Sequence, residues 1–193
     1  LPSVIDRIGQ LKANAKIVAV FSAPFIEYDS KKVSMTDVAL SKGKGYAASR
    51  LVDLKVLRKI YDDLSSNYLN SIYKHEFMDL LNSFFHEVTI SLKQAAENKR
   101  FVDVVRSRTL AYSGEIPMSY LMDYVLRSRG FKSGHVNITQ WPIITDDNFE
   151  GANFSLEDSR RNISYLLDLI EHNEVVTMGG FIGKTIDGLE TTY

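Results

Sequence analysis

The hydrophobic residues of this chain form two kinds of pattern, helical stripes and short continuous runs. Residues 16–22 and 174–178 are unbroken apolar runs rich in Val and Ile, which is typical of strands buried on both faces of a parallel sheet. Residues 3–13, 118–129 and 155–171 carry apolar side chains at helical spacing. Because strands alternate with helices along the chain, the pattern predicts an α/β domain with a mostly parallel sheet.

A long middle segment, residues 47–99, is expected to be helical, and it contains no proline. Two apolar stripes predict a helical hairpin with a joint near residues 65–67. The stripes consist of Leu51, Leu54, Leu57, Ile60, Tyr61 and Leu64, and of Phe77, Leu80, Leu81, Phe84, Phe85, Val88 and Leu92. We interpret the second, aromatic-rich stripe as packing rather than as a cofactor site. Gly43 and Gly45, just before this segment, are expected to mark a break or tight turn.

Local signals define several shorter elements. Residues 135–138 alternate like a strand, and residues 141–145 read as another extended piece. Gly130 stands where a glycine often ends a helix. Ser155 is a good first residue for the helix expected over 155–171, with two acids in its first turn. Asp187-Gly188 predicts a two-residue hairpin turn.

Composition narrows the class of protein. The chain has 193 residues, of which 45% are hydrophobic and 24% charged, as in an ordinary globular domain. The net charge of −1 argues against general attraction to nucleic acid or to an anionic membrane. Because there is no cysteine, disulfides, thiolate metal sites and cysteine nucleophiles are excluded. We expect a cytoplasmic protein, since no signal peptide or membrane-spanning run is visible.

The stretch after the last apolar run is a glycine loop, Gly179 to Gly183, that continues into the hairpin. A ligand can approach a glycine backbone closely, because no Cβ stands in the way. The loop is not a phosphate-binding P-loop, because its first glycine would fall at Met178 and no helix follows. A purely structural loop stays open as the alternative.

Three polar clusters follow apolar runs or precede a predicted helix: Ser22-Ala23, Ser113-Gly114-Glu115 and the glycine loop. Ligands of parallel α/β sheets bind beyond the carboxyl ends of the strands. We therefore predict that these three clusters converge.

The same motifs resemble the aspartate kinases of the amino-acid kinase family. Gly180-Phe181-Ile182-Gly183-Lys184-Thr185, with Asp187-Gly188 and Thr191-Thr192 behind it, is similar to the glycine loop of that family. Three further segments agree in order. They are residues 16–23, the Gly114-Glu115 pair before a helix ending in residues 127–130, and residues 144–149. The resemblance covers the whole chain and is most specific from Val105 to Thr192.

This resemblance implies a fold and a reaction. The fold would be the three-layer αβα sandwich of the amino-acid kinases (carbamate kinase-like), with residues 47–99 as a helical insertion. Residues 1–193 would form the acceptor-binding lobe, and the ATP-binding lobe and regulatory domains would lie outside them. The implied reaction transfers the γ-phosphoryl group of ATP to the β-carboxylate of L-aspartate, as in lysine, threonine and methionine biosynthesis. The full-length enzyme would use ATP and Mg²⁺ and form a homodimer.

The resemblance also assigns site residues. Glu115 would pair with the α-ammonium group of aspartate, and Gly180 and Phe181 would contact the amino acid through their backbone. Ser22 and Thr36 would lie beside the substrate, although the segment between them is longer than the family's usual spacing.

The family's catalytic residues have no counterpart in this sequence. Its opening Lys-Phe-Gly-Gly strand supplies a lysine, and its later Arg-Gly-Gly-Ser-Asp segment supplies an arginine and a catalytic aspartate. We therefore assign no catalytic residue and expect the piece to be inactive alone, as if cut from a longer polypeptide. A non-catalytic amino-acid-binding or regulatory module stays open, as does another amino-acid kinase of the glutamate or acetylglutamate type.

Simpler interpretations remain for other polar residues. No pair of the four histidines has metal-ligand spacing, and His135 and His172 are isolated in the sequence. Asp146-Asp147 could hold magnesium, but acids beside an Asn and near a Gly more often shape a turn, which we favour. Arg106 and Arg108 could contact anions, although a solvated face is the simpler expectation. Glu115 could merely begin a helix, where acids are favoured.

Overall fold

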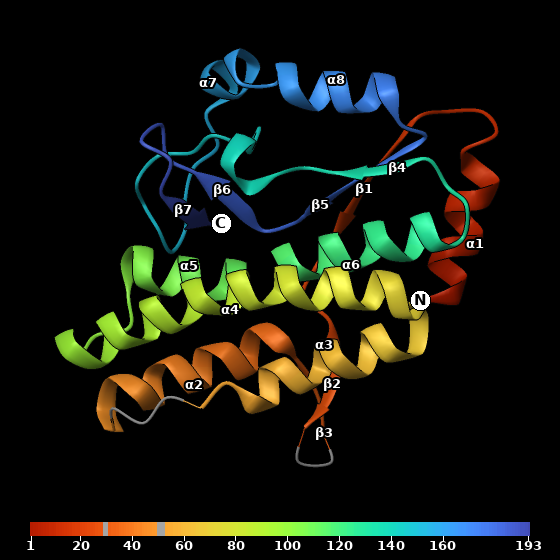
Figure 1. The fold of residues 1–193 in the computed structure, drawn as a ribbon. Coiled ribbons are helices and arrows are strands. Elements are labelled where there is room, and N and C mark those ends of the chain that lie inside the picture. Colours follow the sequence, from red (N-terminus) through yellow and green to blue (C-terminus); the bar gives the residue numbers. More distant parts are fainter. Residues whose placement is uncertain (29–30, 50–52) are drawn as a thin grey trace.

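The structure is a computed structural model that describes residues 1–28, 31–49 and 53–193. Leu51, which the sequence places in the first apolar stripe, lies outside the described residues. The fold is helix-rich α/β, built in layers around a parallel sheet (Figure 1).

The sheet has the order β1-β5-β4 and all its strands run parallel. The central strand β5 (Val175–Gly179) is buried at every position, which is why its sequence is a continuous apolar run. β1 (Ile17–Phe21) lies at one edge, and Val18 and Val20 are 39% and 60% exposed. The expectation of burial on both faces is therefore confirmed for β5 and wrong for β1, which packs through one face only.

Helices cover both faces of the sheet. Figure 1 shows α7 and α8 over one face and α6 on the other, with α4 below α5 and α6 and with α2 and α3 outermost. The helices are α1 (Pro2–Leu11), α2 (Met35–Ser49), α3 (Lys55–Tyr68), α4 (Ser71–Asn98), α5 (Asp103–Ser113), α6 (Glu115–Ser128), α7 (Leu156–Arg161) and α8 (Ser164–His172). The αβα sandwich thus carries an added helical layer. This layer includes α3 and α4, which lie in the segment 47–99 that was expected to be helical.

The joint of the helical hairpin lies later than predicted, at Leu69 and Asn70. The Asn70 side chain accepts a hydrogen bond from the backbone N–H of Tyr73 at 3.0 Å and so caps the start of α4. Ser65 and Ser66 both donate to the carbonyl of Asp62, which keeps their side chains compatible with the helix. The capping residue Asn70 therefore marks the joint between the two helices, and the serine pair does not.

Gly43 and Gly45 do not break the chain, because both lie inside α2. A Cβ at Gly43 would stand 2.2–2.4 Å from ring atoms of Phe101, whereas one at Gly45 would meet nothing within 4 Å. Gly43 is thus present for the close approach of an aromatic ring. The prediction failed because the ring comes from a distant part of the chain.

The helix expected over 155–171 is divided into α7 and α8. Ser155 caps α7 as predicted, accepting from the N–H of Asp158 at 3.4 Å. The division falls at Asn162, whose side chain donates to the carbonyl of Trp141 and whose N–H closes the last turn of α7. Gly130, at φ 81°, follows α6 as predicted.

Two extended segments differ from expectation. β4 occupies Ser133–His135, because Asn137 accepts from Thr139 and starts a short 3₁₀ turn over Ile138–Gln140. An antiparallel hairpin, β2 (Phe25–Tyr28) with β3 (Lys31–Ser34), fills the long spacing before Thr36. Met35 N–H then donates to the Pro24 carbonyl at 2.9 Å, so the chain returns to the end of β1.

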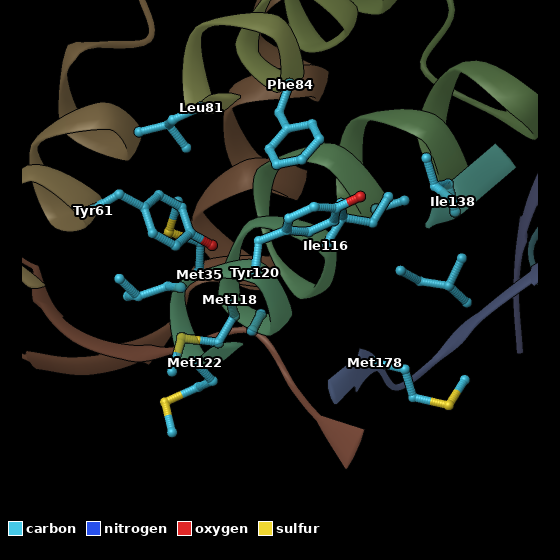
Figure 2. Packing of buried hydrophobic residues seen from close by; sticks show 14 of the residues in the cluster. Met35, Tyr61, Leu81, Phe84, Ile116, Met118, Tyr120, Met122, Ile138 and Met178 are labelled. Carbon is cyan, nitrogen blue, oxygen red and sulfur yellow. The ribbon is translucent and has the colours of Figure 1, made fainter. Parts of the chain in front are cut away.

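The largest core cluster lies between the sheet, α6 and the helical layer (Figure 2). Tyr61, Leu81 and Phe84 from α3 and α4 meet Ile116 and Tyr120 of α6 there. The aromatic stripe therefore serves packing, as predicted. No helix in the described part of the chain is long and apolar enough to cross a bilayer.

A pair of substitutions in α2 tests the close approach at Gly43. Gly43→Ala should lower the free energy of unfolding by about 1–3 kcal/mol, because the added methyl group overpacks against the buried Phe101 ring. Gly45→Ala should raise it by about 0.5–1 kcal/mol, because alanine favours the helix and the site is open. Urea unfolding measures both, and equal effects of the two changes would contradict the assignment.

Candidate functional site

Three backbone segments meet at the carboxyl ends of β1 and β5. Ala23 N–H donates to Glu115 Oε1 at 3.4 Å, which joins the end of β1 to the corner between α5 and α6. Gly180 N–H donates to the Phe21 carbonyl at 2.8 Å, which joins the glycine loop to β1. The structure thus brings together the three polar clusters, as the topology predicted.

Two glycines allow this close approach. A Cβ on Gly114 would lie 2.9 Å from the Cβ of Ala23. A Cβ on Gly179 would lie 3.0 Å from the Cβ of Glu115 and 3.2 Å from its backbone. Since contacts this short are rarely tolerated, both positions need glycine to seat the start of α6 against the two strand ends.

Glu115 is the chemically unusual residue of this site. Its side chain is buried (3% exposed), and its Oε2 has no hydrogen-bond partner among the described residues. Burial raises the pKa of its carboxyl to about 7, partly opposed by hydrogen bonds from its own N–H and that of Ala23. A buried carboxylate with a free oxygen gains most from a cationic hydrogen-bond donor.

Tyr61, on α3, supports the corner from below and was assigned by the sequence only to packing. Its hydroxyl donates to the carbonyls of Ser113 and Gly114 at 3.0 and 2.7 Å, and its side chain is fully buried. Burial, followed by the charge of Glu115, raises the pKa of its hydroxyl well above the ordinary value. A tyrosine in an otherwise apolar stripe was the signal that could have indicated this role.

The glycine loop leads into the hairpin that Asp187-Gly188 predicts. β6 (Ile182–Lys184) pairs antiparallel with β7 (Glu190–Thr192), and Gly188 has φ 84°. Phe181 has φ 60°, a left-handed conformation that is unfavourable for residues other than glycine. Its ring is 36% exposed beside Tyr193, at 6.3 Å between centroids. The backbone of Gly180 and Phe181 is therefore shaped for a reason other than packing of the ring.

Ser22 and Thr36 stand in different relations to this site. Ser22 is exposed, and its hydroxyl lies 3.9 Å from where a Cβ of Gly180 would be. Thr36 is half-buried in the first turn of α2, and the preceding Met35 is bonded to Pro24. The substrate contacts assigned to Ser22, Thr36, Gly180, Phe181 and Glu115 by resemblance stay predictions.

The expectation of a solvated face at Arg106 and Arg108 is wrong, because both anchor the hairpin to α5. Arg108 Nε donates to Glu190 Oε2 at 3.0 Å, and Tyr112 donates to Glu190 Oε1 at 3.3 Å. Arg106 donates to the Thr192 hydroxyl at 3.2 Å. The hairpin that follows the loop is thus held by buried polar contacts.

Asp146 and His135 make structural contacts. Asp146 accepts hydrogen bonds from the side-chain amide and the N–H of Asn153 and from the N–H of Asn148, which lowers the pKa of its carboxyl and confirms the turn interpretation. The Nδ1 of His135 lies 3.1 Å from Asp123 Oδ2. The described residues contain no group of three or more His, Asp or Glu side chains that could hold a metal ion.

Comparisons with known proteins agree with the architecture. No family model matches the sequence, and no curated protein sequence matches it. The structure superposes on Escherichia coli aspartokinase III solved with aspartate and ADP (TM-score 0.76, 16% identity) and with lysine and aspartate (0.74, 16%). It also resembles Clostridium acetobutylicum aspartate kinase (0.58, 15% identity).

The superpositions cover nearly all of this chain but less than half of each aspartokinase chain. The superpositions cover 98% of this chain for the E. coli enzyme and 100% for the Clostridium enzyme, but only 40% and 37% of those chains. The chain therefore has the fold of the corresponding part of aspartokinases, which confirms the predicted fold class.

The raised pKa of Glu115 predicts a pH dependence of stability. Between about pH 4.5 and 7 the folded state holds a proton that the unfolded state has lost, so this residue makes stability fall as pH rises. Glu115→Gln removes that dependence. The free energy of unfolding of Glu115→Gln, relative to wild type, should rise by up to about 3 kcal/mol across this window, as measured by urea unfolding at a series of pH values.

Glu174 supplies a control of opposite sign. Hydrogen bonds from the Lys132 N–H and the Lys12 side chain lower the pKa of its exposed carboxyl. Its contribution to stability is present above its unfolded pKa and is lost as pH falls. Glu174→Gln should therefore lose stability relative to wild type as pH rises, and equal slopes for wild type and Glu115→Gln would contradict the assignment at Glu115.

Proposed function

We propose that this chain forms the amino-acid acceptor site of an aspartate kinase, in which L-aspartate receives the γ-phosphoryl group of ATP on its β-carboxylate. The observation that carries the proposal is the buried Glu115 carboxylate, with one unpartnered oxygen, at the meeting of two strand ends and a glycine loop. The likeness in fold to aspartokinases supports the same function.

The amine of the substrate is the natural partner of Glu115. An α-ammonium group offers three donors and a positive charge, so it satisfies the free Oε2 and neutralises a carboxylate that burial otherwise disfavours. An N-acetylated amino acid lacks this charge. The site therefore favours a free amino acid over an acetylglutamate-type substrate.

The glycine loop would position the rest of the amino acid. Because the Gly180 N–H already donates to Phe21, the Gly180 carbonyl and the backbone of the left-handed Phe181 would contact the amino acid, which meets no Cβ at Gly180. In this proposal Ser22 and Thr36 lie along the side chain of aspartate. Holding the β-carboxylate in one orientation is the main help that phosphoryl transfer needs from a protein.

In the reaction, a β-carboxylate oxygen of aspartate bonds to the γ-phosphorus as the bond to the β,γ-bridging oxygen breaks, giving an acyl phosphate and ADP. We assign no residue of this chain to ATP or Mg²⁺. The charge-stabilising lysine, arginine and aspartate of the family have no counterpart in this sequence. The product would feed lysine, threonine and methionine biosynthesis, and homodimerisation stays a prediction.

A second candidate is an amino-acid-binding module without catalysis. The observation that favours it is that the seat for an amine is built entirely from residues of this chain, with Glu115 packed against Ala23 and Gly179. Both candidates predict aspartate binding, and phosphoryl transfer separates them.

Aspartate binding should release a proton through Glu115. Because its carboxyl has a pKa of about 7 when the site is empty, pairing with an ammonium group must ionise it. Calorimetry in buffers of different ionisation enthalpy should show release approaching about one proton near pH 6 and about none near pH 8. Glu115→Gln should abolish the release and weaken binding by about tenfold or more.

N-acetyl-L-aspartate is the matched control ligand, since it keeps both carboxylates and lacks the ammonium group. Its binding should be weak and insensitive to Glu115→Gln. Tight binding of this compound, or undiminished aspartate binding by the variant, would remove Glu115 from the proposed site.

Because residues 1–193 are expected to be inactive alone, phosphoryl transfer is tested on the full-length protein, by incubating it with aspartate, ATP and Mg²⁺ and trapping the acyl phosphate with hydroxylamine. Hydroxamate that depends on aspartate supports the kinase. Aspartate binding with no hydroxamate supports the binding module.

A further inference from the structure

A cavity lies beside the hairpin that follows the glycine loop. It has a volume of about 290 Å³ and lies between the hairpin, α7 and the segment that carries Trp141. Its lining includes Thr139, Trp141, Asp158, Arg161, Lys184 and Thr185. Neither Glu115, Gly180, Ser22 nor Thr36 lines it, so it is separate from the proposed amino-acid site.

Lys184 brings an incompletely neutralised positive charge to this cavity. Its side chain is 13% exposed, and its Nζ donates to the Ile138 carbonyl at 3.1 Å. The nearest acid, Glu190, is 3.8 Å away and already accepts from Arg108 at 3.0 Å. Burial lowers the pKa of Lys184, and the charge of Glu190 only partly opposes this. An anion in the cavity would stabilise this ammonium group.

The other polar groups of the cavity include the donors of Arg161 and Thr185 and one carboxylate, that of Asp158. Arg161 is largely exposed (70%) and pairs with Glu157 and, at 3.5 Å, with Asp158, which leaves guanidinium N–H groups to share. Asp158 is engaged, since it accepts from the Ser155 hydroxyl at 2.6 Å. The Thr185 hydroxyl accepts from the Leu189 N–H at 3.1 Å and keeps its own proton to donate.

We propose that this cavity binds a small oxyanion, the carboxylate or phosphate group of a metabolite, between Lys184 and Arg161, with Trp141 as its apolar wall. The volume is at the lower end of that of ligand pockets, which suits one small molecule. Two cationic side chains on opposite elements, β6 and α7, give the anion charge-assisted hydrogen bonds from two directions. The site rests on side chains of this chain alone and does not depend on the proposed kinase function.

Trp141 supplies a direct readout, because it is the only tryptophan of the chain and lines the cavity. We would titrate the protein with inorganic phosphate and, separately, with acetate, at constant ionic strength set with chloride. The fluorescence of Trp141 should change saturably with at least one of the two probes. The tighter probe then distinguishes a phosphate-type from a carboxylate-type ligand.

Three substitutions locate the binding. Lys184→Met should weaken it about tenfold or more, because it removes a charge-assisted hydrogen bond. Arg161→Gln should weaken anion binding severalfold. Because the Arg161 side chain is exposed, this variant should stay folded and tests the site even if Lys184→Met unfolds. Arg160→Gln, the adjacent arginine of α7 outside the cavity lining, should leave binding unchanged.

The outcome is separable from that of the proposed function. Glu115→Gln should leave the phosphate and acetate titrations unchanged while it weakens aspartate binding. The inference is overturned if neither probe gives a saturable change. It is also overturned if Arg161→Gln and a folded Lys184→Met bind as well as wild type.

Discussion

The structure depends on the close contact of three backbone segments at the carboxyl edge of the sheet. Ala23 packs against Gly114, and Glu115 packs against Gly179 at distances that admit no Cβ on either glycine. These contacts fix the carboxyl ends of β1 and β5 relative to the start of α6. Glu115 is buried as a consequence, since it is the first residue of α6 and enters the sheet edge there.

The added helical layer contributes to the same contact. Tyr61 reaches from α3 to the carbonyls of Ser113 and Gly114 at the corner where α5 gives way to α6, and the Gly114 carbonyl also accepts the first helical bond of α6, from the Met118 N–H at 3.1 Å. Its ring packs edge-on against Phe85 and at a tilt to Phe77, both of α4. The helical layer therefore supports the site as well as enlarging the core. A loss of packing around Tyr61 would loosen Ser113 and Gly114 and so displace the adjacent Glu115.

The elements that could be predicted from the sequence are those that neighbouring residues along the chain determine. The Val-rich run of β5, the cap at Ser155, the glycine after α6 and the Asp187-Gly188 turn each carry their own signal. The failures involve distant partners, such as the Phe101 ring at Gly43 and the Glu190 carboxylate at Arg108. Glu115 was found through a resemblance, but its burial and free oxygen follow only from Gly179 and Ala23, which no local pattern reveals.

The hairpin after the glycine loop is held in place by contacts with other parts of this chain. A Cβ on Gly183 would lie 2.4 Å from a side-chain carbon of Thr145, and the hydroxyls of Thr145 and Thr191 are 2.7 Å apart. Arg108 and Tyr112 hold its second strand through the buried Glu190. Since these contacts need no ligand, the left-handed Phe181 at the base of the hairpin is set in advance. Selectivity for an amino acid would then come from donors and acceptors that are already in place, which reduces the entropy lost on binding.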